Sequence, residues 1–480
     1  MASHDPSGPV GAPPPTPLRE MVAGFDRASW KLPKIVATQA KFAARLERVT
    51  DKIGLVLLLL AAGVLLFRPA DLFPVLEGVP IYEMVISACI VVSLPRVFAQ
   101  LRESSLRRNA VVALTLTLVP AVMLSHLWRA NLFDARIGGL AMLKACILFL
   151  LMVVIVDTPR KLSATLLAVM GSVFAVTVLA VLQYHDFVHL PGLESVVGRS
   201  PDPDNPSVVR LCGVGVFNDP NDFSLVLVTA GVICVHGLSE RPTTMLRMAL
   251  VVPLGLFGYA LWLTHSRGGL LSAEAAVLGF LAARYGWRNA LPLTLVAVPL
   301  ILVAFSGRAT SMNLDDPEDT FQARLALWSD SLEAFRSSPL FGIGQARLAD
   351  VIGQVSHNSY LQAFAEMGLF GGTLFIGAFY LVIRGTIRAV PADPTLARLR
   401  PFVAAMTSGY AAGLLSLSRC YTVPTQLMLA IATAFMALAA RTGTVSCPRL
   451  DWPCVRRISG LGGLFLVATY LFVRLLLQRR

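Results

Sequence analysis

The sequence predicts an all-α polytopic membrane protein with about twelve transmembrane helices, a thirteenth candidate near the C-terminus and a large helical loop on the outward face. Of its 480 residues, 55% are hydrophobic and only 15% are charged, and the mean hydropathy is +0.67. The apolar residues also form runs of about 15 to 21. At 1.5 Å per helical residue, these runs match or approach a bilayer core of roughly 30 Å, whereas transmembrane strands are much shorter.

The predicted spans divide the chain into three parts. Residues 1–50 form a tail that is Pro-rich and disordered at its start, residues 51–441 form the membrane domain, and residues 442–480 hold the thirteenth candidate. We expect spans at 53–67, 79–97, 110–127, 137–156, 162–182, 223–238, 245–263, 269–283, 290–305, 369–383, 401–417 and 425–440, with a weaker candidate at 458–473.

Positive charges orient the predicted bundle, because Lys and Arg accumulate in short cytoplasmic loops. One alternate set of loops is strongly basic, and so is the N-terminal tail, which predicts a cytoplasmic N-terminus. This topology signal accounts for most of the net charge of +12, so nucleic-acid binding is a poor interpretation. The basic loops carry Arg96, Arg102, Arg107, Arg108, Arg160, Lys161, Arg241, Arg247, Arg284, Arg288, Arg384, Arg388, Arg398 and Arg400.

Two outward loops are much longer than the other connections, at residues 183–222 and 306–361. Long loops on a rigid scaffold often carry binding and catalytic residues. In the first loop, Asp202 and Asp204 form an Asp-x-Asp pair that could bind a metal. Their neighbours are prolines and an asparagine, which favours a turn instead.

Three other polar residues each allow two interpretations. Asn218 and Asn221 precede or begin a span, where they could contact a sugar or cap the helix, and capping is favoured. Lys144 lies inside the fourth span and needs a partner. It could help to hold an anionic substrate group, or it could pair with Glu83.

The second long loop contains a predicted helix. Asp316 and Pro317 form a typical start, and apolar residues then recur at offsets of four and three, which predicts one apolar stripe packed on the bundle or on the membrane surface. Arg324 lies beside the stripe, where its guanidinium could bind an anion or simply extend to the headgroup region. The stripe comprises Phe321, Leu325, Trp328, Leu332 and Phe335.

Two further segments could carry chemistry. His357 lies at the entrance to the span at 369–383, where a neutral imidazole could act as a general base or serve only a structural role. Arg267 lies at the outward end of the span at 245–263 and could hold an anion bidentately or anchor the helix end. The Gly-rich residues 341–345 lack the lysine and flanking strand of a nucleotide loop and are better read as a tight turn.

Taken in order, these motifs resemble the signature region of the O-antigen ligase and polymerase superfamily. The similarity covers roughly residues 50–440. The possible thirteenth span departs from the usual twelve. The residues that carry the resemblance are 215–221, 266–269, Arg324 with Trp328, 339–344, His357 with Asn358 in 357–362, and Glu366 in 366–371.

The resemblance implies an inverting glycosyltransferase that needs no metal and no cofactor. It implies an undecaprenyl diphosphate-linked glycan as donor, a glycan or lipid A core hydroxyl as acceptor, and an active site on the periplasmic face of the bacterial inner membrane. His357 would deprotonate the acceptor, and Arg267 and Arg324 would bind the diphosphate. Lys144, Asn218, Asn221, Trp328, Asn358 and Glu366 are supporting candidates.

Two hypotheses from other classes remain open. A transporter or flippase of lipid-linked glycans would need polar groups along a path through the spans, but few charges interrupt them. In a non-catalytic scaffold, the proximity of Arg267, Arg324 and His357 would be a coincidence. Within the enzyme hypothesis, a ligase and a polymerase share the same donor chemistry, and local motifs do not distinguish them.

Overall fold

The computed structural model describes residues 34–190, 192–193, 195–199, 207–240, 244–304, 320–443 and 447–477. The chain divides into two compact units, Met1–Lys52 and Ile53–Arg480. The described part of the first unit, residues 34–52, is helical and carries exposed charged side chains. The features that follow belong to the second unit, except that α2 (Lys34–Phe67) begins in the first.

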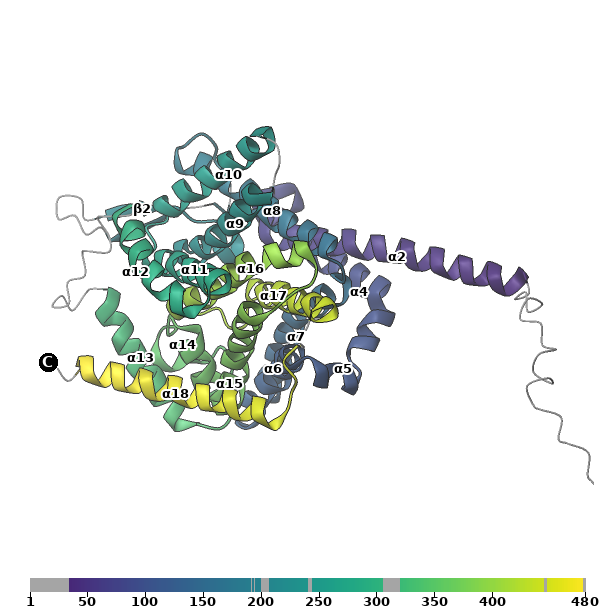
Figure 1. The fold of residues 1–480 in the computed structure, drawn as a ribbon. Coiled ribbons are helices and arrows are strands. Elements are labelled where there is room, and N and C mark those ends of the chain that lie inside the picture. Colours follow the sequence, from purple (N-terminus) through teal and green to yellow (C-terminus); the bar gives the residue numbers. More distant parts are fainter. Residues whose placement is uncertain are drawn as a thin grey trace, which may run out of the picture. The chain divides into compact units, whose positions relative to one another are not determined.

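The second unit is a bundle of long helices (Figure 1). The predicted spans correspond to helices, several of which extend beyond the predicted bounds by about a turn or more. The long helices are α2 (Lys34–Phe67), α4 (Ile81–Gln100), α6 (Ala110–Leu127), α7 (Leu132–Ile155), α8 (Pro159–Tyr184), α9 (Pro220–Glu240), α10 (Thr244–Leu263), α11 (Arg267–Tyr285), α12 (Trp287–Ala304), α13 (Thr320–Ser337), α15 (Ser359–Arg388), α16 (Pro394–Gly413), α17 (Val423–Thr442) and α18 (Trp452–Leu477).

Within the described residues, nine helices are long and apolar enough to cross a membrane: α2 with the short helix α3, α4, α6, α7, α8, α9, α15, α17 and α18. The chain is therefore a polytopic helical membrane protein. Helices α10, α11, α12 and α16 coincide with four further predicted spans, so the total of twelve, or thirteen with α18, stays a prediction. Helix α18 confirms that the weaker candidate near the C-terminus is a long apolar helix.

The predicted basic loops meet at one end of the bundle. Arg400, near the start of α16, donates hydrogen bonds to the carbonyl of Ala389 after α15 at 2.7 Å and to that of Ala283 in α11 at 2.5 Å. Arg441 in α17 donates to the carbonyl of Asp157 between α7 and α8 at 3.2 Å. These contacts support the alternation that the charge pattern predicted, since all these loops were placed on one side.

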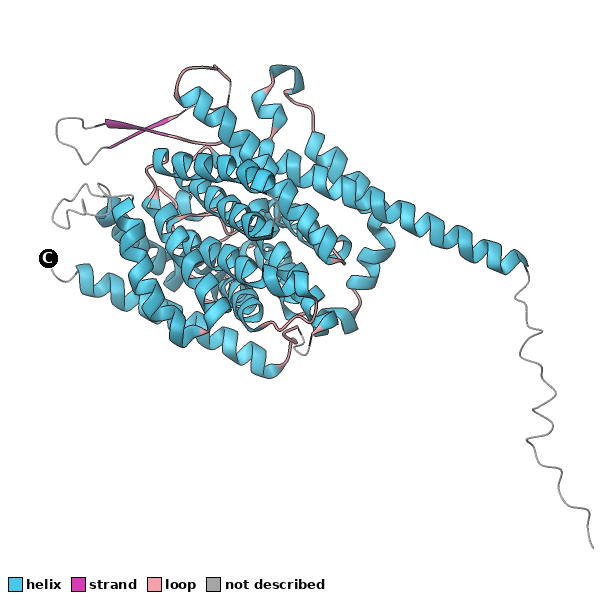
Figure 2. Ribbon diagram, turned by 45° about the horizontal axis from the view of Figure 1, so that its top comes forward, coloured by secondary structure: helices cyan, strands magenta, loops and turns pink. Residues whose placement is uncertain are grey.

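Short elements connect the long helices, and one of them departs from the all-α prediction. In Figure 2, two magenta strands form an antiparallel hairpin in the first long loop, with Val196 opposite Arg210. The strands are β1 (Val196–Arg199) and β2 (Ser207–Arg210), and the short helices are α3 (Pro69–Leu72), α5 (Glu103–Arg108), α14 (Leu348–Ile352), η1 (Pro74–Leu76), η2 (Gly215–Phe217) and η3 (Leu414–Ser416).

Helix α15 is broken at Gly368, whose φ is +65°. The glycine turn at 341–345 crosses the chain at this break. The amides of Ile343 and Gly344 donate to the carbonyls of Ala365 and Glu366 at 3.0 and 3.1 Å. A Cβ on Gly342 would overlap the backbone of Glu366, and one on Gly368 would overlap that of Leu340. The glycines are therefore needed for a backbone crossing, not for a nucleotide.

Helix α13 packs its apolar stripe on the bundle. Leu325 and Leu332 are buried, and together with Leu361 of α15 and Val473 of α18 they form one apolar cluster. The ring of Phe335 also meets Phe364 edge to face, with 6.2 Å between their centroids. Of the two predicted locations for this stripe, the structure shows packing against protein.

Three sequence predictions lie outside the described residues. These are the disordered start of the tail, the turn at Asp202 and Asp204, and the helix start at Asp316 and Pro317. Helix α13 is described from Thr320 onward.

Candidate functional site

The N-termini of α9 and α11 are joined by buried hydrogen bonds. Ser266 caps α11, because its Oγ accepts from the amide of Gly269 at 3.0 Å. The same hydroxyl donates to Oδ1 of Asn221 at 2.7 Å and lies 3.1 Å from the Oγ of Ser224. Both helices thus point the positive ends of their dipoles toward one region, an arrangement that favours bound anions.

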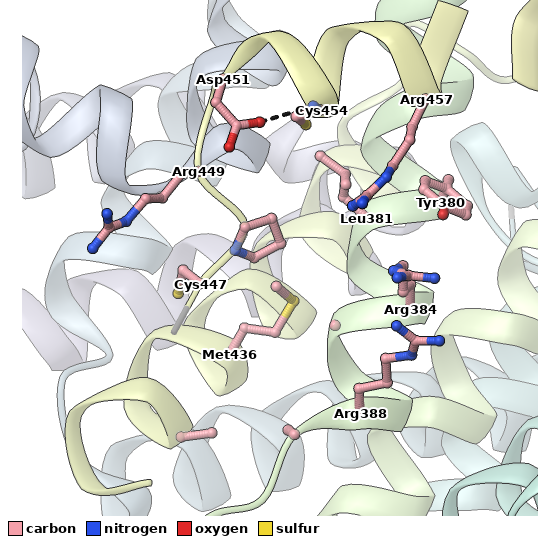
Figure 3. A pocket seen from close by; sticks show the side chains of 14 residues that line it. Tyr380, Leu381, Arg384, Arg388, Met436, Cys447, Arg449, Asp451, Cys454 and Arg457 are labelled. Carbon is pink, nitrogen blue, oxygen red and sulfur yellow. Dashed lines mark hydrogen bonds between the residues drawn. The ribbon is translucent and has the colours of Figure 1, made fainter. Parts of the chain in front are cut away.

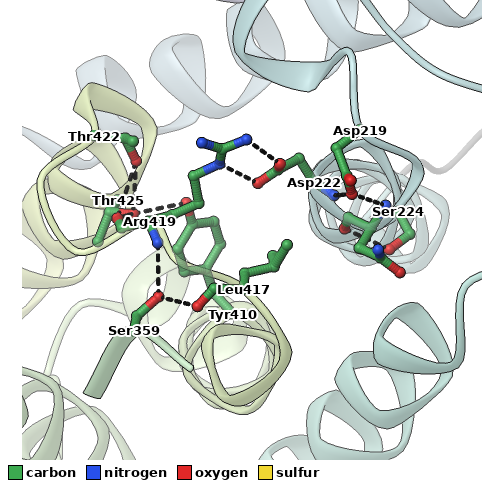
Figure 4. Close-up of polar contacts among 10 residues, drawn as sticks. Asp219, Asp222, Ser224, Ser359, Tyr410, Leu417, Arg419, Thr422 and Thr425 are labelled. Carbon is green, nitrogen blue, oxygen red and sulfur yellow. Dashed lines mark hydrogen bonds and ion pairs between the residues drawn. The ribbon is translucent and has the colours of Figure 1, made fainter. Parts of the chain in front are cut away.

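The N-terminus of α15 joins the same region through Arg419, in the loop before α17. Arg419 makes a two-pronged ion pair with Asp222 of α9, with Nε–Oδ1 at 2.8 Å and Nη2–Oδ2 at 2.6 Å (Figure 4). Its backbone amide donates to the Oγ of Ser359, which in turn donates to the carbonyl of Leu417. Helices α9, α11 and α15 therefore begin around one polar cluster.

Arg210 enters this cluster from the end of β2. Its Nε donates to the carbonyl of Thr264 at 3.0 Å, and its Nη2 lies 3.4 Å from Oδ1 of Asn221. Burial lowers the pKa of Arg210, although the charge of Asp219 opposes this effect. The hairpin that the sequence did not predict thus places a guanidinium beside the start of α11.

Asp219 is a carboxylate that caps a helix and also affects the pKa of the basic groups in the cluster. Its Oδ1 caps α9 by accepting from the amides of Asn221 at 2.7 Å and Asp222 at 3.4 Å. Its negative charge also acts on the pKa of Arg210, Arg324, His357 and Arg419. The carboxylate that caps α9 therefore also favours the protonated forms of four basic side chains.

Arg324 extends from α13 into the same cluster. Burial lowers its pKa, Asp219 opposes that shift, and the positive charges of Arg210 and Arg267 lower the pKa further. Arg324 thus lies within electrostatic range of two other guanidinium groups. A guanidinium stays protonated in proteins, so the region holds a concentration of positive charge that an anion would relieve.

His357 is held in an unusual backbone conformation beside this charge. Its φ is +48°, a left-handed value that is uncommon outside glycine. Its neighbours fix it on both sides. The Oγ of Ser356 bonds to the carbonyl of Asn358 at 2.9 Å, and Oδ1 of Asn358 caps α15 through the amides of Tyr360 and Leu361, each at 3.1 Å.

The surroundings of His357 favour its neutral form. Burial lowers the pKa of its imidazole, the charge of Arg324 lowers it further, Asp219 raises it, and Arg419 lowers it. The side chain is only partly buried. A neutral, partly accessible imidazole can accept a proton from a hydroxyl group.

Of the three residues that the resemblance singled out, Arg324 lies within electrostatic range of both Arg267 and His357. The supporting residue Trp328 fastens α13 to the histidine loop, because its Nε1 donates to the carbonyl of Ser356 at 3.0 Å. Lys144 instead lies 3.9 Å from Glu83, and both side chains are more than half exposed. Of the two predicted roles of Lys144, the structure shows the ion pair.

The helix cap of α9 is a neighbour of the two residues that were predicted to provide it. Asp219, not Asn218 or Asn221, caps α9. The prediction was wrong for Asn221 because Pro220 takes the first helical position, which places Asn221 one residue inside the helix. Its side chain is then free to bridge Ser266 and Arg210. The side chain of Asn218 is exposed beside the cap.

Glu366 is fully buried and has a structural role. Its carboxylate accepts from the amides of Ala346 at 2.9 Å and Leu348 at 3.3 Å, and from Nε2 of Gln362 at 3.1 Å. These bonds tie the segment after the glycine turn to the first half of α15. Glu366 therefore supports the helix that carries Asn358 at its start.

Sequence reasoning missed Arg210, Arg419, Asp219 and Asp222. One signal could have pointed to the two arginines. Both lie in predicted outward loops, where the charge bias of membrane proteins disfavours Lys and Arg. A cation in such a loop therefore indicates a local partner or ligand. Here Asp219 acts on both arginines, and Asp222 pairs with Arg419.

The fold and the site define a polytopic helical membrane protein with a cluster of arginines and one histidine at the end of its bundle where α9, α11 and α15 begin. Residues 252–376 match the family model of O-antigen ligase, which confirms the resemblance to the O-antigen ligase superfamily. The match runs from α10 into α15 and includes Arg267, Arg324 and His357, while Arg210 and Arg419 lie outside it. A comparison with curated proteins gives no match. The family supports an O-antigen ligase-like, glycosyltransferase-like role in polysaccharide biosynthesis.

Proposed function

We propose that this protein transfers a glycan from an undecaprenyl diphosphate-linked donor to an acceptor hydroxyl at the periplasmic face of the bacterial inner membrane. The observation that supports the proposal is the position of Arg324, whose positive charge favours the neutral form of His357 and which itself lies within electrostatic range of Arg210 and Arg267. The acceptor is a second glycan or a lipid A core, as in a polymerase or a ligase.

The arginines would bind the diphosphate. A guanidinium presents donors in a planar fork that matches phosphate oxygens. Arg324 and Arg267 are the proposed ligands of the diphosphate, and Arg210 adds charge from β2. Arg210 already has polar contacts with Thr264 and Asn221, which preorganise it. Because the leaving diphosphate gains negative charge as the glycosidic bond breaks, these groups would stabilise the transition state more than the ground state.

His357 would act as the general base. Its imidazole accepts the proton of the acceptor hydroxyl while that oxygen attacks the anomeric carbon. The bond between the anomeric carbon and the diphosphate oxygen breaks on the opposite side, so the configuration inverts. The charge balance of this step is complete without a divalent metal, because the arginines neutralise the leaving group.

An apolar groove beside the cluster suits the isoprenoid tail of the donor. A cavity of about 390 Å³ lies between α9, α10, α11 and α16, and its lining is almost entirely apolar. Leu261 lines this groove and also lies against Gly269, two residues from Arg267. A lipid diphosphate with its head at the arginines could therefore place its tail in this groove, which begins close to the start of α11.

Purified protein in vesicles, supplied with lipid-linked glycan on the side of the cluster and with a hydroxyl acceptor, tests the proposal. His357→Ala should lower the rate by about 10² to 10⁴. His236→Ala is the matched control, since that imidazole lies near the C-terminal end of α9, opposite the cluster, and packs against the ring of Phe402. A parental rate in His357→Ala would overturn the assignment of the base. Glycan movement across the vesicle without product would instead indicate a flippase.

A further inference from the structure

A second concentration of arginines lies at the other end of α15, roughly 40 Å along the helix from Ser359. A cavity of about 260 Å³ opens there between the end of α15, α17 and the segment 447–457. Arg384 and Arg388 line it from α15, and Arg457 lines it from α18 (Figure 3). This cavity is separate from the proposed catalytic cluster.

Backbone hydrogen bonds and close helix packing hold the walls of this cavity in place. The segment before α18 is tied to the start of α6, because the amide of Ala110 donates to the carbonyl of Pro448 at 2.8 Å and the amide of Leu450 donates to that of Arg107 at 3.1 Å. On the opposite wall, α15 and α17 are in close contact at Gly385 and Met436. The arginines therefore line a preformed cavity.

The charge in the cavity is strongly unbalanced. Figure 3 shows Arg384, Arg388 and Arg457 on the same side, whereas Arg449 points away from them. Among the described residues of the lining, Asp451 is the one acidic side chain, and its Oδ1 accepts from the amide of Cys454 at 2.8 Å as the cap of α18. The guanidinium of Arg384 lies 6.0 Å from the ring centre of Tyr380, a contact that leaves its donors available.

The positive-inside bias explains why arginines occur at the ends of these helices. It does not explain why three of them, from two helices far apart in sequence, converge on one cavity. The lining also includes apolar side chains, among them Leu381 and Met436. Arginines above apolar helix surfaces match a molecule with a phosphate head and an acyl body.

We propose that this cavity binds the phosphate diester head of an anionic phospholipid, with the guanidinium groups of Arg384, Arg388 and Arg457 on the phosphate. The acyl chains would lie along the apolar surfaces of α15 and α17. The bound lipid would bridge α15, whose other end carries the proposed catalytic histidine, to α17 and α18. The site does not depend on the glycan-transfer proposal.

Lipid titration of the purified full-length protein tests this site. The thermal midpoint is measured in detergent against phosphatidylglycerol, phosphatidylcholine and inorganic phosphate, and native mass spectrometry counts retained lipid. Phosphatidylglycerol should raise the midpoint more than the other two. Arg388→Gln and Arg457→Gln should each weaken its apparent affinity about fivefold, and the triple variant with Arg384→Gln roughly a hundredfold.

The matched control removes the same charge elsewhere. Arg102, Arg160 and Arg288 are exposed arginines in the predicted cytoplasmic loops and do not line the cavity. Their triple change to Gln should weaken phosphatidylglycerol binding by less than about fivefold. Equal losses in both triples would overturn the site in favour of general surface attraction. Equal protection by inorganic phosphate would overturn the lipid as its ligand. The two single variants decide the question if a triple variant does not fold.

Discussion

Asp222 and Arg419, 197 positions apart in the sequence, form a two-pronged ion pair that joins α9 to the loop before α17. The Asp222 side chain is 6% exposed and that of Arg419 is 35% exposed. The amide of Arg419 also bonds to Ser359, the first residue of α15. This pair therefore connects the helix starts around the proposed site.

Arg419→Gln should destabilise the protein by about 2–3 kcal/mol, because it leaves a buried carboxylate without its partner, although partial exposure of the arginine reduces the cost. Thermal inactivation of the detergent-purified protein measures the change. In the double variant with Asp222→Asn, the second change should cost much less than it does alone. Additive costs of the two single changes would show that the pair contributes nothing as a unit.

The pH profile reports on His357. Its pKa is held below the ordinary value of about 6.5, through burial first and Arg324 second. The neutral form is the active base, so the rate should fall only as the pH drops through this lowered pKa. Arg324→Gln removes a positive charge that opposes protonation, so the acid limb should move to higher pH. Asp219→Asn removes a negative charge and should move the limb to lower pH. Shifts of the opposite sign would contradict the arrangement.

Arg324 should contribute to the transition state through both charge and geometry. Arg324→Gln should lower kcat/KM by roughly 10². Arg324→Lys should recover only part of this loss, because an ammonium retains the charge but lacks the planar fork. Arg336→Gln, on the exposed surface of the same helix, is the control and should leave kcat/KM unchanged. Similar effects of the two Gln variants would remove Arg324 from the diphosphate site.

The apolar groove should set the affinity for the lipid tail. Gly258 lines the groove and has open space where a side chain would lie, so Gly258→Phe would fill it. We expect KM for the lipid-linked donor to rise roughly tenfold with little change in kcat. Gly255→Phe, on the same helix and also facing open space but outside the lining, controls for loss of a helical glycine. An unchanged KM in Gly258→Phe would place the isoprenoid elsewhere.

The crossing of the glycine turn with α15 should be intolerant of side chains. Gly342→Ala combines a positive φ of 78° with overlap on the backbone of Glu366, so it should cost more than about 2 kcal/mol. Gly353→Ala has a similar φ of 80° and nothing within 4 Å, so it should cost only about 1 kcal/mol. Thermal midpoints of the two variants separate steric overlap from backbone strain. Equal losses would mean that the close crossing is unimportant.

Much of the fold follows from local patterns. Long apolar runs can satisfy their backbone groups in a bilayer only as helices, so the positions of the long apolar helices could be predicted from the sequence. The stripe at 325–332 also predicted a helix with one packed side, and the structure shows α15 and α18 against it. The hairpin at β1 and β2 was not predicted, because strands of four residues carry too little pattern to stand out.

The sequence by itself determined the long apolar helices, the grouping of basic loops, and the motif residues Arg267, Arg324 and His357, because each is encoded in neighbouring residues. Only the tertiary structure decided that Arg210, Asp219 and Arg419 surround these residues, that Lys144 pairs with Glu83, and that three arginines share a cavity at the far end of α15. Such relationships depend on how helices pack across long sequence distances. A charge can be paired or unpaired at the same position in a pattern, and only its neighbours in space determine which.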